Sequence, residues 1–275
     1  MALSEPLPDL EEVLASIGQA GRRLAEMHAS EGAAGNISVF IGFPLEVRRR
    51  FPLAEPLPLP QPAPALAGKL VIVTGSGRRL RDVRDNPAAN LGCVLIDKSG
   101  EHGTLYTAPE RLFARVTSEF NSHLAVHNDL VARTGTNFHA VVHAQPLHIT
   151  YLSHMAAYRD ELTLNRRLMR WQPETLINLP EGIGVVPFIL PGSPALQAAS
   201  LEKLLHHRII LWSKHGVMAR SDMSVTKAAD RIEYAETAAH YEYLDLANGG
   251  RGEGLSDEEM RELIRAFGVE TNLYG

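Results

Sequence analysis

A buried strand, a turn and a long helical segment follow one another at residues 209–247, and this stretch decides the fold class. It begins Ile209-Ile210-Leu211-Trp212-Ser213-Lys214-His215-Gly216 and ends before Gly249-Gly250. Four large apolar residues in a row, stopped by a turn, indicate a buried strand. The segment after the turn carries apolar residues at helical spacing, namely Val225, Ala228, Ala229, Ile232, Ala235, Ala239, Tyr243 and Leu246. We therefore expect a sheet covered by helices.

Strands and helices are interspersed along the rest of the chain as well. Asp9 and Glu12 are spaced as a capping pair for a helix that ends near Met27. Ser118 is placed to cap a helix that runs to about Thr134. A second capping pair starts the last helix, whose apolar residues are Met260, Leu263, Ile264 and Phe267. Apolar, β-rich runs predict strands at residues 36–40, 69–74, 91–97, 104–107, 140–143 and 184–189. This mixture predicts an α/β or α+β fold.

Proline is concentrated between residues 51 and 66, where it occupies positions 52, 56, 58, 60, 62 and 64. Such a stretch is typical of a linker between two domains or of an extended surface segment. Too little chain precedes it to form an independent domain. The interpretation is therefore one domain over residues 1–275, with an extended surface segment at about 51–66.

The composition excludes several classes of protein. The net charge of -5 provides no positive surface for nucleic acid or for an acidic membrane. The single cysteine, Cys93, excludes an internal disulfide and favours a reducing compartment. The start of the chain lacks the pattern of a signal peptide, and no apolar run approaches the ~20 residues that cross a bilayer. These features predict a cytoplasmic enzyme with no nucleic-acid or membrane partner.

Twelve histidines invite a metal hypothesis, because neutral imidazole is a common metal ligand. His143 and His215 each follow a short apolar strand, and strand ends are where α/β folds place reactive groups. The alternative is that both histidines only form hydrogen bonds at the start of a loop. His148 is notable only because it lies close to His143 in the sequence.

A second pair of histidines, His123 and His127, is spaced to lie on one face of a helix. A protease-type zinc site would have a glutamate directly after the first histidine, and Leu124 stands there instead. These two histidines are therefore interpreted as packing or surface residues.

Two glycine-containing turns are candidates for holding an anion. Gly75-Ser76-Gly77 follows a predicted strand and precedes two arginines, so its backbone N–H groups could surround a phosphate. Gly35-Asn36 is a second turn of this kind. Neither turn has the complete pattern of a nucleotide-binding loop, and an ordinary turn explains them equally well.

Two glutamates are candidates for acid–base chemistry. Glu119 lies at a predicted helix start, where the helix dipole favours an ionised carboxylate. Glu174 follows Pro173 in a stretch without clear periodicity. Carboxylates in such places are usually only solvated.

The sequence motifs, taken in their order along the chain, resemble those of the class II aldolase and adducin family. No single motif carries the resemblance, but the ordered set covers most of the chain. The matching stretches are Gly35-Asn36, VTGSG at 73–77, DNPAANLG at 85–92, TSE at 117–119, AVVH at 140–143, PETLINLPEGIGVVPF at 173–188, KHG at 214–216 and RAFGV at 265–269.

The resemblance implies one α/β domain with a central, largely antiparallel sheet flanked by helices. It implies cleavage of a phosphorylated ketose, L-rhamnulose 1-phosphate, by a zinc-dependent aldolase. By motif, His143 and His215 match metal ligands, and Glu119 matches the catalytic acid or base. Glu174 matches a carboxylate that reaches the site of a neighbouring subunit in a homotetramer. The matches to phosphate and substrate contacts are Asn36, Gly75, Ser76, Gly77 and Ser118.

One departure from the family pattern affects the metal site. The family usually has a second histidine two positions after the first, and Gln145 stands there in this chain. Three explanations are open: Gln145 is a weak ligand, His148 or Glu119 completes the set, or the metal is lost. A retained divalent metal is favoured because the other motif residues remain.

Two rival functions also stay open. A sugar-phosphate 4-epimerase shares the scaffold that the resemblance implies, and so does a non-catalytic adducin-like module. Ala33, in place of a family asparagine, removes one phosphate contact that the resemblance would imply.

Overall fold

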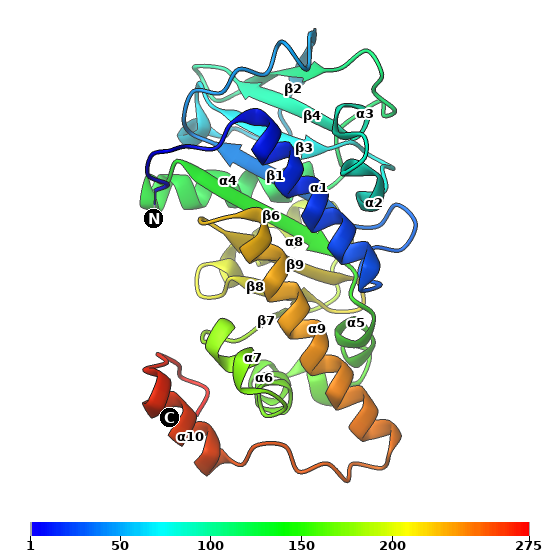
Figure 1. Cartoon of the computed structure of the whole chain (residues 1–275), viewed down its shortest axis with the longest axis vertical. Helices are drawn as coiled ribbons and strands as arrows, with labels where there is room; N and C mark the ends of the chain where they lie inside the picture. The colour runs from blue at the N-terminus through cyan, green and yellow to red at the C-terminus, as the bar shows by residue number, and fades with distance from the viewer. Residues whose placement is uncertain (1, 275) are drawn as a thin grey trace.

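One sheet of nine strands runs through the computed structural model, which describes residues 2–274 (Figure 1). Neighbouring strands are antiparallel, except that β7 and β8 are parallel. The order across the sheet is β2-β5-β4-β3-β1-β6-β9-β8-β7. The strands are β1 (Asn36–Ile41), β2 (Leu53–Pro58), β3 (Leu70–Thr74), β4 (Leu91–Ile96), β5 (His102–Thr107), β6 (Phe138–Ala144), β7 (Gly184–Val186), β8 (Ile209–Trp212) and β9 (Gly216–Ser221). The expected α/β domain with a largely antiparallel sheet is confirmed.

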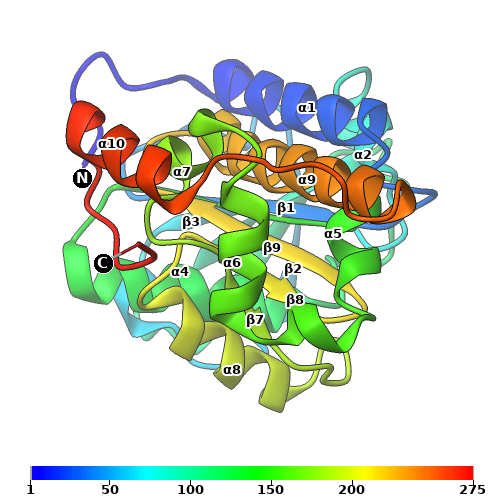
Figure 2. The ribbon, with the colours of Figure 1, turned by 90° about the horizontal axis from the view of Figure 1, so that it is seen from below.

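Helices cover both faces of this sheet (Figure 2). Two long helices, α1 and α9, lie on one face, and α4 and α8 lie on the other. The α-helices are α1 (Leu10–Glu26), α2 (Leu80–Val83), α3 (Pro87–Asn90), α4 (Phe120–Thr134), α5 (Leu147–Leu152), α6 (Glu161–Met169), α7 (Pro173–Asn178), α8 (Pro194–Leu204), α9 (Val225–Ala247) and α10 (Asp257–Phe267).

The burial of both faces follows from the alternation of side chains along each strand. In β1, Ile37 and Val39 pack into the core beneath α1 and α9. Phe40 points to the opposite face, where it packs with Phe120 and Leu124 of α4. The central strands are consequently apolar at almost every position, as the sequence predicts for strands enclosed on both sides.

Three predicted helix starts can be compared with the structure. The capping box of α1, made by Asp9 and Glu12, is present, and so is that of α10, which begins after Ser256. The cap predicted for α4 is wrong. Glu119, not Ser118, occupies the N-cap position, and no side chain caps this helix. The backbone N–H of Phe120 is instead bonded to the carbonyl of Thr117, so the turn before α4 is closed by backbone.

Two predicted apolar stripes extend less far than the sequence suggests. Along α9, the apolar residues of the predicted stripe are buried from Val225 to Ala239, whereas Tyr243 is 38% exposed. In α10, Met260 is buried but Phe267 is 65% exposed. Both exposed rings lie near the ends of their helices, where helical periodicity continues beyond the core that it faces.

The proline-rich segment contains β2 and a 3-10 turn at Pro64–Leu66. β2 pairs only with β5, at the edge of the sheet, in the part of the chain that the structure describes. Proline is tolerated in an edge strand, because the missing N–H would face solvent there. Among residues 2–274, no helix has the length and apolar character that a membrane span requires.

Candidate metal centre

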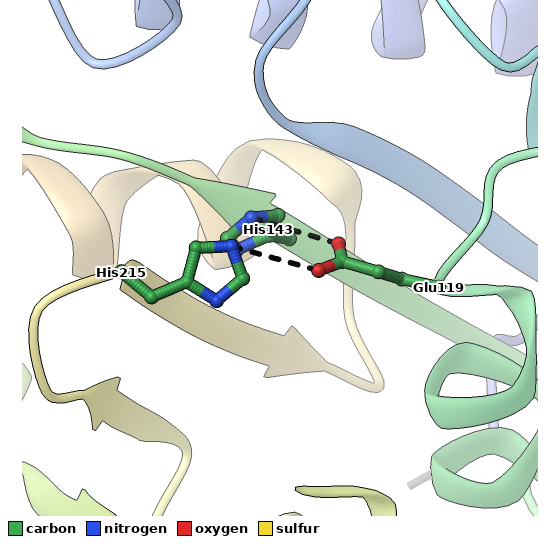
Figure 3. Close-up of side chains that lie close together, drawn as sticks. All are labelled: Glu119, His143 and His215. Atoms are coloured by element: carbon green, nitrogen blue, oxygen red, sulfur yellow. Dashed lines mark ion pairs between the residues drawn. The ribbon is translucent and has the colours of Figure 1, made fainter. Parts of the chain in front are cut away.

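Three side chains from different elements converge at one end of the central strands (Figure 3). His143 is the penultimate residue of β6, His215 lies in the turn between β8 and β9, and Glu119 lies just before α4. The Nε2 atoms of His143 and His215 are each 3.6 Å from a carboxylate oxygen of Glu119. One potential ligand atom from each residue lies within 4.8 Å of the others.

The pairing of β6 with β9 brings the two histidines together. This antiparallel register places Val217 opposite Ala144, so the β8–β9 turn lies beside the end of β6. The turn is tight: Lys214 adopts a φ of 63°, and a Cβ added to Gly216 would lie 2.4 Å from the Ala144 carbonyl oxygen. Glycine at position 216 therefore allows the turn to approach β6 closely enough for the imidazole rings to meet.

A backbone contact orients the ring of His143. Its Nδ1 lies 2.8 Å from the carbonyl oxygen of Val217, which can only accept, so Nδ1 carries the hydrogen. The lone pair of Nε2 then faces the cluster. A ring held in this way is typical of histidines that bind metals.

His215 is kept neutral by its surroundings. Burial and the nearby His143 lower its pKa to about 4, although Glu119 opposes this shift. The ring is stacked on Trp212, with centroids 5.2 Å apart. A neutral imidazole is the form that binds a metal ion.

Glu119 is the anionic member of the cluster. Burial raises the pKa of its carboxyl group, but His143, a hydrogen bond from Asn36 and His215 outweigh burial and leave the pKa below its ordinary value. The Asn36 Nδ2 atom donates to Glu119 Oε2 at 2.8 Å. The carboxylate is therefore both ionised and held in place.

This donor set fits a divalent cation. Bonds of about 2.0–2.2 Å to nitrogen and oxygen ligands put tetrahedral donors roughly 3.4 Å apart, close to the 3.6 Å separations observed. Two imidazoles and one carboxylate leave at least one coordination position open, as in catalytic zinc sites. A site that was only structural would be expected to have a fourth protein ligand.

A family model described as the class II aldolase and adducin N-terminal domain matches residues 15–243. The chain belongs to the class II aldolase and adducin family. The resemblance expected from the ordered motifs is thus confirmed.

Curated relatives extend the family match to nearly the whole chain. A rhamnulose-1-phosphate aldolase from Bacteroides thetaiotaomicron is 29% identical over 272 residues, which are 98% of each protein. One from Enterococcus faecalis is 31% identical over 254 residues, covering 90% of this chain and 88% of the relative. Among solved structures, a sugar-phosphate aldolase from Thermotoga maritima has a TM-score of 0.74 and 28% identity, covering 89% of this chain and 98% of the other. Family membership, these relatives and the three-residue cluster together support a metal-dependent aldolase.

The structure shows where the candidate residues for the third ligand lie in this class II aldolase, whereas loss of the metal stays an open explanation. Glu119 joins the two histidines. His148 does not: its Nδ1 is 2.7 Å from Glu236 of α9, and its ring is stacked on His240. The side-chain amide of Gln145 forms no hydrogen bond within the described part of the chain, although its backbone N–H donates to Ala29. The expectation that His148 is a ligand receives no support from this arrangement.

The first glycine turn is less open than the sequence suggests. The N–H groups of Gly75 and Ser76 already donate to the carbonyls of Asn90 and Arg115, so they are not available to an anion. This corrects the expected cradle of backbone N–H groups. Within residues 2–274, the Gly77 N–H and the Ser76 hydroxyl are left without a hydrogen-bond partner.

The other residues matched to phosphate and substrate contacts lie in different environments. Asn36 uses both ends of its amide, toward Glu119 and toward His123, which leaves one amide hydrogen uncommitted. Ser118 is exposed beside the cluster residue Glu119. Glu174 is exposed on α7 and is not part of the cluster. The roles assigned to these residues stay predictions.

Sequence reasoning missed the link between Asn36 and the metal cluster. β1 pairs with β6 in antiparallel fashion, which places Asn36 opposite His143. Sequence reasoning also treated His123 and His127 as unrelated to Glu119, although the three residues are spaced by four, which places both histidines on the helix face that follows the Glu119 cap position. That spacing is a signal that could have joined them.

Proposed function

We propose that this protein is a zinc-dependent aldolase that cleaves L-rhamnulose 1-phosphate to dihydroxyacetone phosphate and L-lactaldehyde. The observation that carries the proposal is the cluster of Glu119, His143 and His215. It occurs in a chain that is similar along 98% of its length to a curated rhamnulose-1-phosphate aldolase. The two imidazoles and one carboxylate favour zinc over magnesium or calcium, which prefer oxygen ligands.

Breaking the carbon–carbon bond leaves negative charge on the fragment that becomes dihydroxyacetone phosphate. A divalent cation bound by the cluster would supply Lewis-acid polarisation of the ketose carbonyl. His143 is suited to hold the cation because Val217 fixes the direction of its ring. His215 is suited because it is neutral and because its turn is fixed against β6.

Glu119 is the proposed acid–base group. Its carboxylate is ionised and lies beside both imidazoles, so it can accept the proton of the hydroxyl that becomes the aldehyde and then deliver that proton to the carbon that gains charge. Proton transfer by a positioned carboxylate typically contributes about 10²- to 10⁴-fold to the rate. With Gln145 in place of a histidine, Glu119 is also the proposed third donor to the cation.

The substrate phosphate is proposed to bind near Gly75-Ser76-Gly77. The free Gly77 N–H and Ser76 hydroxyl supply donors there, and the exposed Ser118 hydroxyl and the remaining Asn36 amide hydrogen are candidates for further contacts. Binding energy from the phosphate would orient the reacting carbonyl, although the phosphate itself does not react.

The assembly and location are proposals as well. We propose a cytoplasmic homotetramer in which Glu174 reaches the active site of a neighbouring subunit. The exposure of Glu174 on α7 supports this arrangement, because a buried side chain could not contact a second chain.

The test is a cleavage assay on the purified protein, with its metal content measured before and after treatment with a strong chelator. We expect lactaldehyde and dihydroxyacetone phosphate to form, activity to be lost with the metal, and Zn²⁺ to restore it. Turnover that survives complete metal removal would overturn the proposal. An epimeric sugar phosphate without free aldehyde would identify a 4-epimerase, and a metal-free protein without turnover would identify an adducin-like module.

A further inference from the structure

A continuous line of buried hydrogen bonds runs from Glu119 into the layer between α4 and the sheet. It begins with the Asn36 Nδ2 bond to Glu119 at 2.8 Å. It continues from the Asn36 Oδ1 atom to His123 Nε2 at 2.5 Å. It then passes from His123 Nδ1 to Ser38 Oγ at 2.7 Å, from Ser38 Oγ to His127 Nε2 at 2.7 Å, and from His127 Nδ1 to His139 Nδ1 at 2.8 Å.

These side chains are isolated from solvent. His123, His127, His139 and Ser38 are 0% exposed, and Asn36 is 8% exposed. Burial and the neighbouring His127 lower the pKa of His123 to about 3, against the opposing effect of Glu119. Burial also places the pKa values of His127 and His139 well below the ordinary range. All three histidines are therefore neutral, and each carries one ring N–H.

Glu119 sets the direction of the first bonds. An ionised carboxylate only accepts, so the nitrogen end of the Asn36 amide must face it. The Asn36 oxygen then faces His123, so the His123 Nε2 atom carries the hydrogen. The opposite orientation would put the Asn36 oxygen 2.8 Å from a carboxylate oxygen with no hydrogen between them.

The remaining bonds follow from the single hydrogen on each neutral group. His123 Nδ1 has no hydrogen, so the Ser38 hydroxyl donates to it. Having donated its only hydrogen, Ser38 must accept from His127 Nε2–H. His127 Nδ1 then accepts from His139 Nδ1–H, which leaves a lone pair on His139 Nε2.

The end of the line agrees with this assignment. His139 Nε2 is buried and has no hydrogen-bond partner among residues 2–274. In the assigned direction, His139 Nε2 is a buried acceptor without a donor. In the reverse direction, the same atom would be a buried N–H without an acceptor. Every hydrogen in the line therefore points toward Glu119.

From this geometry we infer that Asn36, His123, Ser38, His127 and His139 form a one-way hydrogen-bond chain that positions Glu119 for the metal centre. The chain holds Oε2, so that Oε1 faces His215. Successive hydrogen bonds of the same direction polarise one another, which strengthens the bond at the carboxylate. These are positioning residues, and their effect on metal affinity rests on the proposed zinc site.

The first experiment reads the hydrogen positions directly. Nitrogen-15 NMR of the metal-free protein labelled at histidine distinguishes the two neutral ring forms and the charged ring. Single substitutions of the three histidines assign the signals. We expect hydrogen on Nε2 in His123 and His127 and on Nδ1 in His139. A hydrogen on Nδ1 of neutral His123, or a charged ring at His127, would overturn the one-way chain.

The second experiment breaks the chain in the middle. Ser38→Ala removes the hydroxyl that links His123 to His127, and we expect Zn²⁺ affinity, measured by competition with a chromophoric chelator, to fall by about 10-fold or more. Ser122→Ala is the matched control, because Ser122 is also fully buried but its hydroxyl has no partner in the described chain. Equal affinities in the two variants would overturn the positioning role.

The two experiments separate this inference from the proposed function. If the native protein binds no Zn²⁺, the zinc aldolase proposal fails, while the NMR measurement still decides the direction of the chain. If Zn²⁺ binds and the histidine forms differ from those expected, the chain fails and the metal centre stands.

Discussion

At the scale of single residues, Glu119 joins the two main features of the molecule. One carboxylate oxygen faces His215, and the other is held by Asn36 and lies near His143. The desolvation of a buried carboxylate has to be offset by its surroundings, and here two imidazoles and an amide donor lie around it. This residue is therefore the most informative one to change.

Glu119→Gln tests the division between metal binding and proton transfer. Glutamine keeps an oxygen near the histidines but removes the charge and the basic group. At saturating Zn²⁺, we expect kcat to fall by about 10²- to 10⁴-fold, with metal still bound at lower affinity. Glu236→Gln, which changes a buried carboxylate that contacts His148, is the control. Similar kcat values for the Glu119 variant and the native enzyme would remove Glu119 from the chemistry.

The three buried histidines make stability depend on pH. Their pKa values are lowered in the folded state, so below about pH 6.5 the unfolded chain binds more protons. Their contribution to stability is present above that pH and is lost as the pH falls. Each histidine that stays neutral should cost about 1.4 kcal/mol of unfolding free energy per pH unit below this point.

Urea unfolding between pH 7.5 and pH 5 measures this loss. His139→Asn, which can keep the hydrogen-bond donor toward His127, should reduce the slope with pH. A substitution of the exposed His102 should leave the slope unchanged. If His139→Asn has the native slope, then His139 does not stay neutral in the folded protein.

At the scale of elements, α9 holds the segment 158–171, which contains α6, next to the sheet. Its Glu242 is fully buried. It accepts hydrogen bonds from the Tyr158 hydroxyl, from Trp171 Nε1 at 2.8 Å and from Arg167 at 3.1 Å. These partners come from the segment 158–171, which contains α6. One buried carboxylate of α9 therefore contacts three side chains of this segment.

Glu242→Ala should break this connection. Removing one partner leaves the tyrosine, tryptophan and arginine groups without their acceptor, and the loss of a buried charged partner typically costs about 3 kcal/mol or more of unfolding free energy. Thermal or urea unfolding measures the change. Glu262→Ala on the exposed face of α10 should change stability little; a similar loss in both variants would contradict the anchoring role.

At the scale of the whole molecule, the proposed tetramer gives Glu174 its role. The side chain is exposed on α7 and lies outside the metal cluster of its own chain. The proposal therefore assigns this carboxylate to the site of another subunit.

Mixing two inactive variants tests this arrangement. Glu174→Ala and His215→Ala should each be inactive alone, since one lacks the carboxylate and the other a metal ligand. After the subunits are exchanged, about one site in four should combine an intact Glu174 with an intact His215 from its neighbour. Recovery of activity supports shared sites. No recovery, in mixtures shown by mass to contain both variants, would place Glu174 outside the neighbour's site.

Much of the fold could be predicted from the sequence, because apolar spacing directly reflects which side of an element is buried. The strand that carries His143 and the strand β8 before His215 were expected at the right places, as were the capping boxes of α1 and α10, whereas β9 (Gly216–Ser221) was not expected. The cap of α4 could not be predicted correctly, because Ser118 has the right side chain for it. The turn before this helix is fixed instead by backbone hydrogen bonds, from the Thr117 N–H to the Thr74 carbonyl of β3 and from the Phe120 N–H to the Thr117 carbonyl.

The α/β architecture, the family resemblance and two histidines at the ends of apolar strands could all be read from the amino-acid sequence. Contacts between distant elements were needed to show that Glu119, and not His148, lies with these two histidines, and that Asn36 holds Glu119 across 83 positions of sequence. The tertiary structure also showed that two N–H groups of the glycine turn are already bonded. The reason is physical: the period of apolar residues reports burial within one element. The partner of a polar group depends on strand register and helix packing between distant elements, which no local pattern contains.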